Sequence, residues 1–292
     1  MALAHRTRKG YLLTKREFAD FRVYTGLDQL WPVPVEHLQQ FLVFLHRKGL
    51  APSTIQGKLS ALAFYAKSNG YKDTTSDYRI RKMLEGWSRE RGRVHDSRTP
   101  FSPPLLEQLC DQWESLCRDL YEAALFKAAA LIAFFGALRV SELVAMGKAD
   151  ASRQALQQGD VIIHDNCLKI TIRLSKADQK GKDRLLTLGQ CSLKQICPVA
   201  AVQAFMELRG QGPSYFLQHA DKSPLTKFQF WKLTDIALDR IGIRGLRFGT
   251  HSFRIGAAST ATALGYSVEQ IKRLGRWSSS CYRKYVRNLP NV

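Results

Sequence analysis

Two segments of the chain place charged side chains at spacings that could bind and activate a phosphate group. Arg139 follows a long apolar run, and Glu142 stands three residues later, so the charge of Arg139 must be paired or must serve a ligand. His251 and Arg254 are also three residues apart, which puts both side chains over one turn of a helix that Thr250 is expected to cap. Because a helix N-terminus adds backbone N–H donors and partial positive charge, this segment is predicted to form a phosphate cradle.

Two further segments carry a possible proton donor and a possible nucleophile. Lys176 lies in a lysine-rich run that is predicted to form a hairpin tip, and its ammonium group could donate a proton into a groove. Tyr282 and Tyr285 are three residues apart, in a basic segment that follows Trp277. A tyrosine hydroxyl, with a pKa of about 10, needs a base or nearby cations before it can attack. The phosphate cradle and Lys284 are candidates for that cationic surrounding.

Each of these segments also has an ordinary structural explanation. The first arginine and its glutamate could be an intrahelical ion pair. The lysine-rich run could be a solvated turn, and the two tyrosines could be half-buried aromatics. A histidine and an arginine at helical spacing are by themselves weak support for a ligand site. The function therefore depends on whether the segments occur together in one fold.

The sequence before these segments predicts an all-helical N-terminal domain over residues 1–92. Apolar residues recur at helical spacing in two places, 38–45 and 80–87. Thr14-x-x-Glu17 and Ser53-x-x-Gln56 have the pattern of capping boxes and are expected to open helices. Residues 93–102 are basic and end next to several prolines, so they are interpreted as a linker that could follow a phosphate backbone.

Residues 103–292 are predicted to form a second domain of mixed α+β type, in which helix dominates. Ser102 is expected to cap a helix that starts at Pro103, and helices are predicted over 103–117 and 119–136. The β-prone runs 161–163, 168–172 and 184–188 are separated by turn signals and predict a small antiparallel meander. Helices are expected again from Pro198 onward. The chain as a whole is thus mainly α, with one small antiparallel sheet.

The charge balance favours nucleic acid as the partner. Lys and Arg outnumber Asp and Glu by 44 to 25, a formal charge of +19, which favours a polyanion. A membrane is disfavoured, because the most apolar stretch, Ala123–Leu138, is short and contains Lys127. No signal peptide is expected, since no apolar run follows the basic start. The residues expected to contact DNA are Arg47, Lys48, Lys58, Arg79, Arg81, Lys82, Arg91 and Arg93.

The cysteines and carboxylates predict a protein without metal or cofactor. None of the six cysteines forms a Cys-x-x-Cys pair, and no Cys/His cluster has zinc spacing. Cys110 and Cys117 are seven residues apart and are interpreted as small buried hydrophobes of a reduced, intracellular protein. The sequence contains no P-loop and no carboxylate cluster for paired metals.

Taken in order, the motifs resemble the catalytic set of the tyrosine recombinases, the family of phage integrases and of Xer- and Cre-type recombinases. The resemblance covers nearly the whole chain and is specific because five motifs follow in the right order: Arg139, Lys176, His251-x-x-Arg254, Leu274-Gly275-x-Trp277 and Tyr285. The tryptophan box looks closest to Cre and to recombinases of eukaryotic DIRS and Crypton elements. The resemblance implies a core-binding domain and a catalytic domain that form a C-shaped clamp around DNA.

Carried over residue by residue, the resemblance also implies a role for each side chain. Arg139 and Arg254 would bind the non-bridging oxygens of the scissile phosphate, flanked by His251 and Trp277, and Glu142 would support the first arginine. Lys176 would protonate the leaving 5′ oxygen, and Tyr285 would form a 3′-phosphotyrosine. Tyr285 is preferred to Tyr282 because Tyr285-Val286-Arg287-Asn288 resembles the family's terminal motif. The spacing from Trp277 is one residue shorter than in many members.

The resemblance implies double-stranded DNA as the partner, in the form of a specific recombination site with inverted repeats. A homodimer on each site, a homotetramer in the synaptic complex and no cofactor would follow. Many relatives continue beyond the terminal tyrosine into a helix that docks on a neighbouring subunit, whereas seven residues follow it here. The location would be the nucleus in a eukaryotic host, which is favoured, and otherwise the cytoplasm or nucleoid.

Two alternatives remain open at this point. A type IB topoisomerase uses the same chemistry and would relax plasmid DNA without a cognate site. A domesticated DNA-binding protein that has lost catalysis would form no covalent adduct with DNA.

Overall fold

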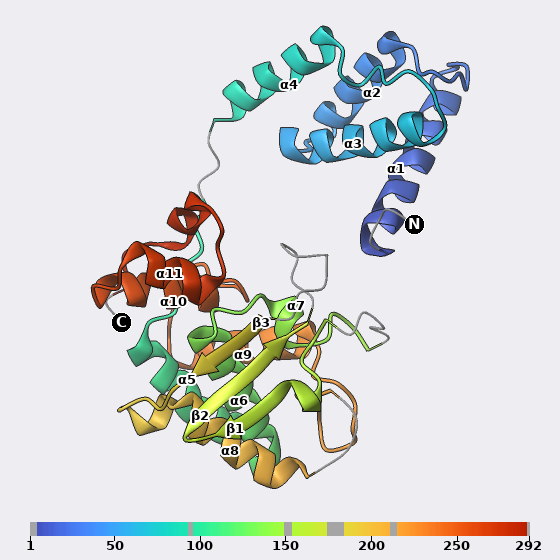
Figure 1. The fold of residues 1–292 in the computed structure, drawn as a ribbon. Helices are drawn as coiled ribbons and strands as arrows, with labels where there is room; N and C mark the ends of the chain where they lie inside the picture. The colour runs from blue at the N-terminus through green and yellow to red at the C-terminus, as the bar shows by residue number, and fades with distance from the viewer. Residues whose placement is uncertain (1–4, 93–95, 149–153, 174–183, 211–214, 291–292) are drawn as a thin grey trace. The chain divides into compact units, whose positions relative to one another are not determined.

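The computed structural model describes residues 5–92, 96–148, 154–173, 184–210 and 215–290, and it divides into two compact units, Met1–Asp96 and Ser97–Val292 (Figure 1). The predicted site residue Lys176 and the predicted DNA contact Arg93 lie outside the described residues. None of the helices in the described ranges is both long and apolar enough to cross a membrane.

The first unit is built from four helices, as the apolar periodicity predicts. They are α1 (His5–Tyr24), α2 (Val35–Arg47), α3 (Pro52–Ser68) and α4 (Tyr78–Arg91). Both predicted apolar faces enter one core, in which the side chains of Leu38, Phe41, Leu42, Leu45, Ile80 and Leu84 are buried. Met83 and Trp87 are partly buried against the same cluster.

The two predicted capping boxes are wrong. Thr14 lies inside α1, and its hydroxyl donates to the carbonyl of Gly10 at 3.1 Å, a bond that satisfies a threonine within a helix. α3 begins one residue before Ser53, with Pro52 at its first position and Ala51 at the cap. Proline has the φ angle of a helix and lacks an N–H that would be unpaired at the first position, so it is well suited to start this helix. No side-chain cap is formed there.

The second unit is a helical body with one small sheet. It begins with α5 (Pro103–Leu116), which Ser102 caps by accepting from the backbone N–H of Leu105 at 3.4 Å, as predicted. The remaining helices are α6 (Leu120–Phe135), α7 (Val140–Leu143), α8 (Pro198–Arg209), α9 (Lys227–Arg240), α10 (Ser252–Ala263) and α11 (Val268–Gly275), with the 3₁₀ turns η1 (Gln158–Asp160), η2 (Lys194–Ile196) and η3 (Ser280–Tyr285).

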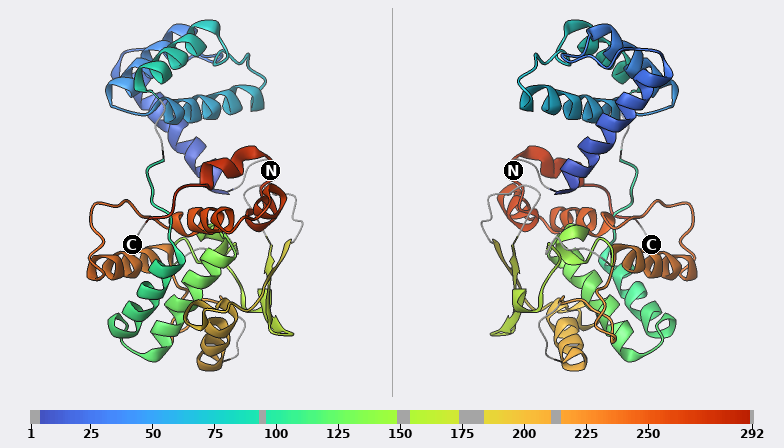
Figure 2. Two further views of the ribbon diagram at one scale, coloured as in Figure 1. Left: turned by 90° about the vertical axis from the view of Figure 1, so that its left-hand side faces the viewer. Right: turned by 90° about the vertical axis from the view of Figure 1, so that its right-hand side faces the viewer.

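The predicted meander is confirmed as a three-stranded antiparallel sheet in the order β1-β2-β3, made of Val161–His164, Cys167–Ile172 and Arg184–Leu188. Ile170 pairs with Val161 on one side and with Leu186 on the other. Alternate residues of β2 are buried, the pattern of a sheet with one face against a core. Seen edge-on in Figure 2, the strands lie on one side of the helices of this unit.

The packing of α10 against α6 brings the predicted site residues together. α6 is buried almost all round, and its contacts include α5, α8 and α10. Gly256 of α10 allows a very close approach, because a Cβ atom there would lie 2.2 Å from the carbonyl oxygen of Phe101 and 2.9 Å from the ring of Phe134. This approach holds the first turns of α10 beside the C-terminal end of α6.

Cys110 is buried in α5, as predicted, and burial raises the pKa of its thiol to about 12. Cys117 is only partly buried, at the C-cap of α5. Burial is the main reason that its thiol also has a pKa raised to about 12, with contributions from Glu122 and Asp119. Both thiols are therefore protonated and unreactive at neutral pH.

One ion pair of this unit should make its stability depend on pH. The imidazole Nδ1 of His219 lies 2.9 Å from both carboxylate oxygens of Glu122, and each side chain is 15% exposed. The hydrogen bond to Glu122 is the main cause that raises the pKa of His219, against the opposing effect of burial. The stabilisation is therefore complete below the pKa of the unfolded chain, about 6.5, and is lost as pH rises through the higher pKa of the folded state.

We expect His219→Gln to lower the free energy of unfolding by about 1 kcal/mol at mildly acidic pH. The difference from the wild type should shrink as pH rises, because the wild-type imidazole then becomes neutral while glutamine does not titrate. Urea unfolding of both proteins across this pH range measures the effect. A difference that grows with pH, or one that does not change, would contradict the assignment.

Candidate active site

The Gly136–Leu138 turn between α6 and α7 presents Arg139 at the surface of the second unit. The Arg139 side chain is 20% exposed, and its Nη1 donates to Glu142 Oε1 at 2.7 Å. The backbone N–H of Arg139 donates to the other carboxylate oxygen at 2.9 Å. The predicted pair is therefore present, and Glu142 holds both the start of α7 and the guanidinium of Arg139.

Glu142 is ionised although it is almost fully buried. Its side chain is 2% exposed, and burial by itself would raise the pKa of the carboxyl. Arg276, the backbone N–H of Arg139 and the Arg139 guanidinium outweigh this effect and hold the pKa of Glu142 below its usual value. A buried carboxylate with these partners keeps its charge at neutral pH.

Arg254 projects from α10 into the interior of the unit and is fully buried. It donates to the carbonyl of Ala137 and, at 2.6 Å, to the carbonyl of Gly275. Burial, together with the charges of Arg139 and Arg276, lowers the pKa of Arg254 to about 10, so the group remains cationic at neutral pH. The guanidinium therefore ties the turn after α6 to the end of α11.

His251 is the N-cap residue of α10, which begins at Ser252. The prediction that Thr250 caps this helix is wrong, and no side-chain cap is formed there. The hydroxyl of Ser252 instead accepts from the backbone N–H of Gly249 at 3.1 Å, which closes the preceding turn. The side chains of His251 and Arg254 nevertheless both lie beside the aromatic ring of Tyr285.

Tyr285 lies at the centre of these side chains. Its hydroxyl oxygen is 3.4 Å from Nε2 of His251. Its ring centroid is 4.8 Å from that of Trp277 and 5.4 Å from Cζ of Arg254. Trp277 also packs on Arg254, with 4.6 Å between the ring centroid and Cζ. Three of the predicted site residues, from the start of α10 and the segment after α11, thus surround the phenol of Tyr285 in η3.

The two tyrosines have different surroundings, which bears on the choice of nucleophile. The segment that carries both tyrosines is a 3₁₀ turn. Tyr282 is 9% exposed and packs in a small cluster that includes Ile271. Its ring lies 6.0 Å from the ammonium group of Lys272. Of the two hydroxyls, that of Tyr285 is the one that the structure records within reach of His251.

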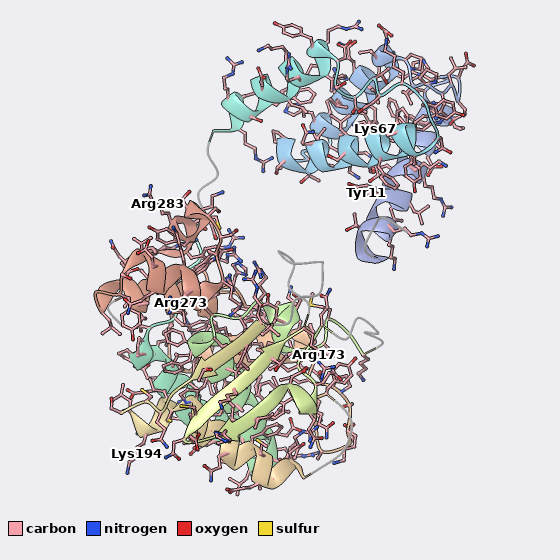
Figure 3. All side chains as sticks on the ribbon, viewed as in Figure 1. Tyr11, Lys67, Arg173, Lys194, Arg273 and Arg283 are labelled. Carbon is pink, nitrogen blue, oxygen red and sulfur yellow. The ribbon has the colours of Figure 1, made fainter. Side chains whose placement is uncertain are left out.

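Two predicted residues, Lys284 and Lys176, stand apart from this centre. Lys284 lies within η3, next to Tyr285, and is exposed. Arg273 and Arg283, labelled in Figure 3, are also exposed on the C-terminal segment. Lys176 lies in the range that the structure does not describe, so its proposed contact with the leaving group stays a prediction.

Two residues of the site were not found from the sequence. Arg276 stands between Gly275 and Trp277, and its guanidinium donates to Glu142 Oε2 at 3.1 Å. Ser259 of α10 donates its hydroxyl hydrogen to the backbone carbonyl of Tyr285 at 3.2 Å and accepts from the backbone N–H of Arg287 at 3.0 Å. A charged residue inside an otherwise apolar box was the available signal for the first. No local signal marks the second.

The predicted DNA contacts in the first unit fall into two groups. Lys58 pairs with Glu17, Arg79 with Glu36 and Asp77, and Lys82 with Glu85. The side chains of Arg47, Lys48, Arg81 and Arg91 are exposed. Among these, Lys48 lies over the ring of Phe44 and Arg81 over that of Tyr78. The second group has the freedom to reach a phosphate backbone without breaking an ion pair that the structure records.

The comparisons with known proteins concern the chain as a whole. No family model matches the chain. The chain is 26% identical over 285 residues to recombinase cre of Escherichia phage P1, an alignment that covers 89% of this chain and 77% of the relative. This identity spans both units.

Solved structures with the same fold are recombinases and integrases bound to DNA. The XerH site-specific recombinase bound to its difH substrate covers 97% of this chain and 75% of its own, with a TM-score of 0.62 and 16% identity. The match to a lambda integrase dimer bound to a COC′ core site covers 100% of this chain and 75% of the integrase chain, with a TM-score of 0.64 and 15% identity. The Tn1549 transposon integrase bound to transposon right end DNA covers 99% and 92%, with a TM-score of 0.65 and 14% identity.

Proposed function

We propose that the chain is a tyrosine recombinase, a site-specific DNA recombinase that cuts and rejoins double-stranded DNA through Tyr285. The observation that carries this proposal is the phenol of Tyr285 enclosed by His251, Arg254 and Trp277. The cognate DNA is a specific site, which the bound substrates of the structural neighbours support.

The proposed reaction is a transesterification at a scissile phosphate. The oxygen of Tyr285 forms a bond to phosphorus, and the bond from phosphorus to the 5′ oxygen of the leaving strand breaks. The phenol proton passes to a base, for which Nε2 of His251 is placed at 3.4 Å. The product is a 3′-phosphotyrosine, and attack by a 5′ hydroxyl of a partner strand reverses the same step. The bond energy is conserved in the intermediate, so rejoining needs no ATP.

The cationic groups stabilise the charge that develops on the phosphate oxygens in the transition state. Arg139 is partly exposed and held by Glu142, so it can meet a non-bridging oxygen without losing its support. Arg254 Nε and Trp277 Nε1 are buried polar atoms without a hydrogen-bond partner among the described residues. Buried donors of this kind are rare, and an oxygen of the scissile phosphate would satisfy them.

Lys176 is proposed as the acid that protonates the leaving 5′ oxygen, on the strength of its place in the motif order. We also propose that the protein acts as a dimer on inverted repeats and as a tetramer in synapsis. We further propose that a mobile genetic element encodes the protein and that, in a eukaryotic host, it is located in the nucleus. The transposon integrase among the structural neighbours supports the mobile element.

The test of the proposal is a covalent adduct with DNA. A duplex that the wild-type protein selects from a random pool would be nicked next to the cleavage position, so that the cut strand diffuses away and rejoining is prevented. The adduct is then resolved on a denaturing gel. We expect a protein–DNA species that a protease removes. If the protein binds the selected duplex tightly and forms no adduct at any nick position, it is a DNA-binding protein without strand-transfer activity.

The affinity for DNA should fall steeply with salt. The formal charge of +19 implies many phosphate contacts, each of which releases counterions, so we expect a loss of about a thousandfold or more between roughly 50 and 200 mM salt. Arg81→Ala should reduce the slope of log affinity against log salt by about one, the effect of one phosphate contact.

Lys58→Ala is the matched control for this prediction, because Lys58 is engaged with Glu17 in the same unit. It should change the slope less than Arg81→Ala does. Fluorescence anisotropy with a labelled duplex measures both variants. An affinity that hardly changes with salt would contradict the electrostatic account.

A further inference from the structure

Arg276 occupies a backbone position that an arginine rarely takes. It follows α11 in the left-handed region, with φ 57° and ψ 39°, a conformation that favours glycine. Its side chain is nonetheless ordered and 8% exposed. It donates to the carbonyls of Gly136 at 2.9 Å and Ala137 at 3.2 Å. Strain of this kind persists where the side chain is held by its surroundings, and it gathers at functional sites.

Besides a bond to the carbonyl of Leu274 at 3.4 Å, the side-chain hydrogen bonds of Arg276 lead to the support of Arg139. One goes to Glu142 Oε2, the same oxygen that accepts from the backbone N–H of Arg139. The others go to the turn that ends at Arg139. In this turn Ala137 also has a left-handed backbone, with φ 43°, and its carbonyl accepts from both Arg254 and Arg276. Arg276 thus holds Arg139 from two sides.

We propose that Arg276 is a positioning residue for the cleavage reaction, which keeps Arg139 both correctly placed and available to the scissile phosphate. The inference rests on the proposed strand-transfer function. Arg276 is not a catalytic residue, because its Nη donors are directed to Glu142 and to backbone carbonyls and its side chain is almost fully buried. Its Nε has no hydrogen-bond partner among the described residues.

The charge balance explains why a second cation is needed. Arg139, Arg254 and Arg276 surround the single carboxylate of Glu142. Were Arg139 its only partner, Glu142 would neutralise the charge that the phosphate needs. Because Arg276 shares the carboxylate, part of the positive field of Arg139 remains for the substrate. This arrangement predicts that removal of the Glu142 charge restores part of the cleavage rate when Arg276 is absent.

The experiment measures single-turnover cleavage of the nicked duplex at saturating DNA. Arg276→Gly accepts the left-handed backbone, so it tests the side chain alone. We expect its cleavage rate to fall about 10- to 100-fold, the range for partners that orient a functional side chain, with no measurable change in affinity for DNA. Arg276→Lys restores the charge and should recover part of the rate. The exposed Arg273→Ala is the surface control and should keep the wild-type rate at saturation.

The decisive variant is the double substitution Glu142→Gln with Arg276→Gly. A buried charge that has lost one partner is destabilising, whereas removal of both charges leaves the site closer to balance. The double variant should therefore cleave faster than Arg276→Gly alone. Chemical unfolding of each variant, at the temperature of the cleavage assay, establishes which of them are folded.

Three outcomes would overturn the inference: wild-type cleavage by Arg276→Gly, a double variant slower than Arg276→Gly, or a loss that lies wholly in DNA affinity. If Arg276→Gly does not fold, the cleavage rates of the double variant and of Arg276→Lys are compared instead. A rate for the double variant far below that of Arg276→Lys contradicts the charge argument. A failure of the proposed function looks different, because the wild type itself would then form no adduct.

Discussion

Replacement of Tyr285 by phenylalanine should abolish the covalent protein–DNA adduct and leave both the fold and DNA binding intact. The substitution removes one oxygen and keeps the ring that packs on Trp277 and Arg254. The backbone of Tyr285 also stays tied to α10 through Ser259. Because the phenol oxygen is the atom that bonds to phosphorus, no residual pathway to the adduct is expected. The nicked duplex on a denaturing gel gives the readout.

Tyr282→Phe is the matched control for this variant. Tyr282 lies three residues away on the same 3₁₀ turn and is almost buried among apolar neighbours. It should therefore keep substantial activity. If Tyr285→Phe still forms the adduct and Tyr282→Phe does not, the assignment of the nucleophile is wrong. Binding of the intact duplex by both variants confirms that neither has lost its fold.

The second large effect is expected for Arg254→Ala. Loss of a preorganised cation that stabilises the transition state should lower the cleavage rate about 10²- to 10³-fold. Since the nucleophile is unchanged, slow cleavage should persist, in contrast to Tyr285→Phe. The same single-turnover assay measures the rate.

Arg254→Ala should also destabilise the protein, which the structure alone indicates. The side chain is fully buried and bridges the carbonyls of Ala137 and Gly275. An unsatisfied buried carbonyl destabilises by about 1–3 kcal/mol, so a clear fall in the free energy of unfolding is expected.

Arg254→Lys separates the two effects on rate and stability. Lysine keeps the charge, but its three donors sit on one compact nitrogen and lack the planar spread with which the guanidinium reaches both carbonyls. It should recover part of the rate and less of the stability. A wild-type rate for Arg254→Ala, in a preparation whose wild type forms the adduct, would remove Arg254 from the catalytic set.

The sequence alone predicted most of the elements and the resemblance to a family. The apolar spacing over 38–45 and 80–87 predicted the helices of the first unit, and the three β-prone runs predicted the sheet. These patterns are local, since a helix or strand shows its own period along a dozen residues. The motif order was sufficient to recognise the tyrosine recombinases, which the likeness to recombinase cre supports.

Helix starts were less predictable, because a cap depends on where the preceding chain arrives. Thr14, Ser53 and Thr250 all have the residue type of a cap, and none of them is one in the structure. α1 begins before Thr14, so that residue lies inside the helix. α3 begins with a proline, one residue before Ser53. The turn before α10 is closed by Ser252, not by Thr250.

The contacts within the site were decided only by tertiary structure. His251 lies 34 residues from Tyr285, and Arg276 lies 134 residues from Glu142, yet each pair is in contact. Spacing along the chain carries no information on such distances. They follow from the close approach of α10 at Gly256, which holds the end of α6 beside the cationic turn of α10. This packing gives physical support to the preference for Tyr285 over Tyr282. It also shows the role of Arg276, because burial and hydrogen bonding are properties of the folded chain.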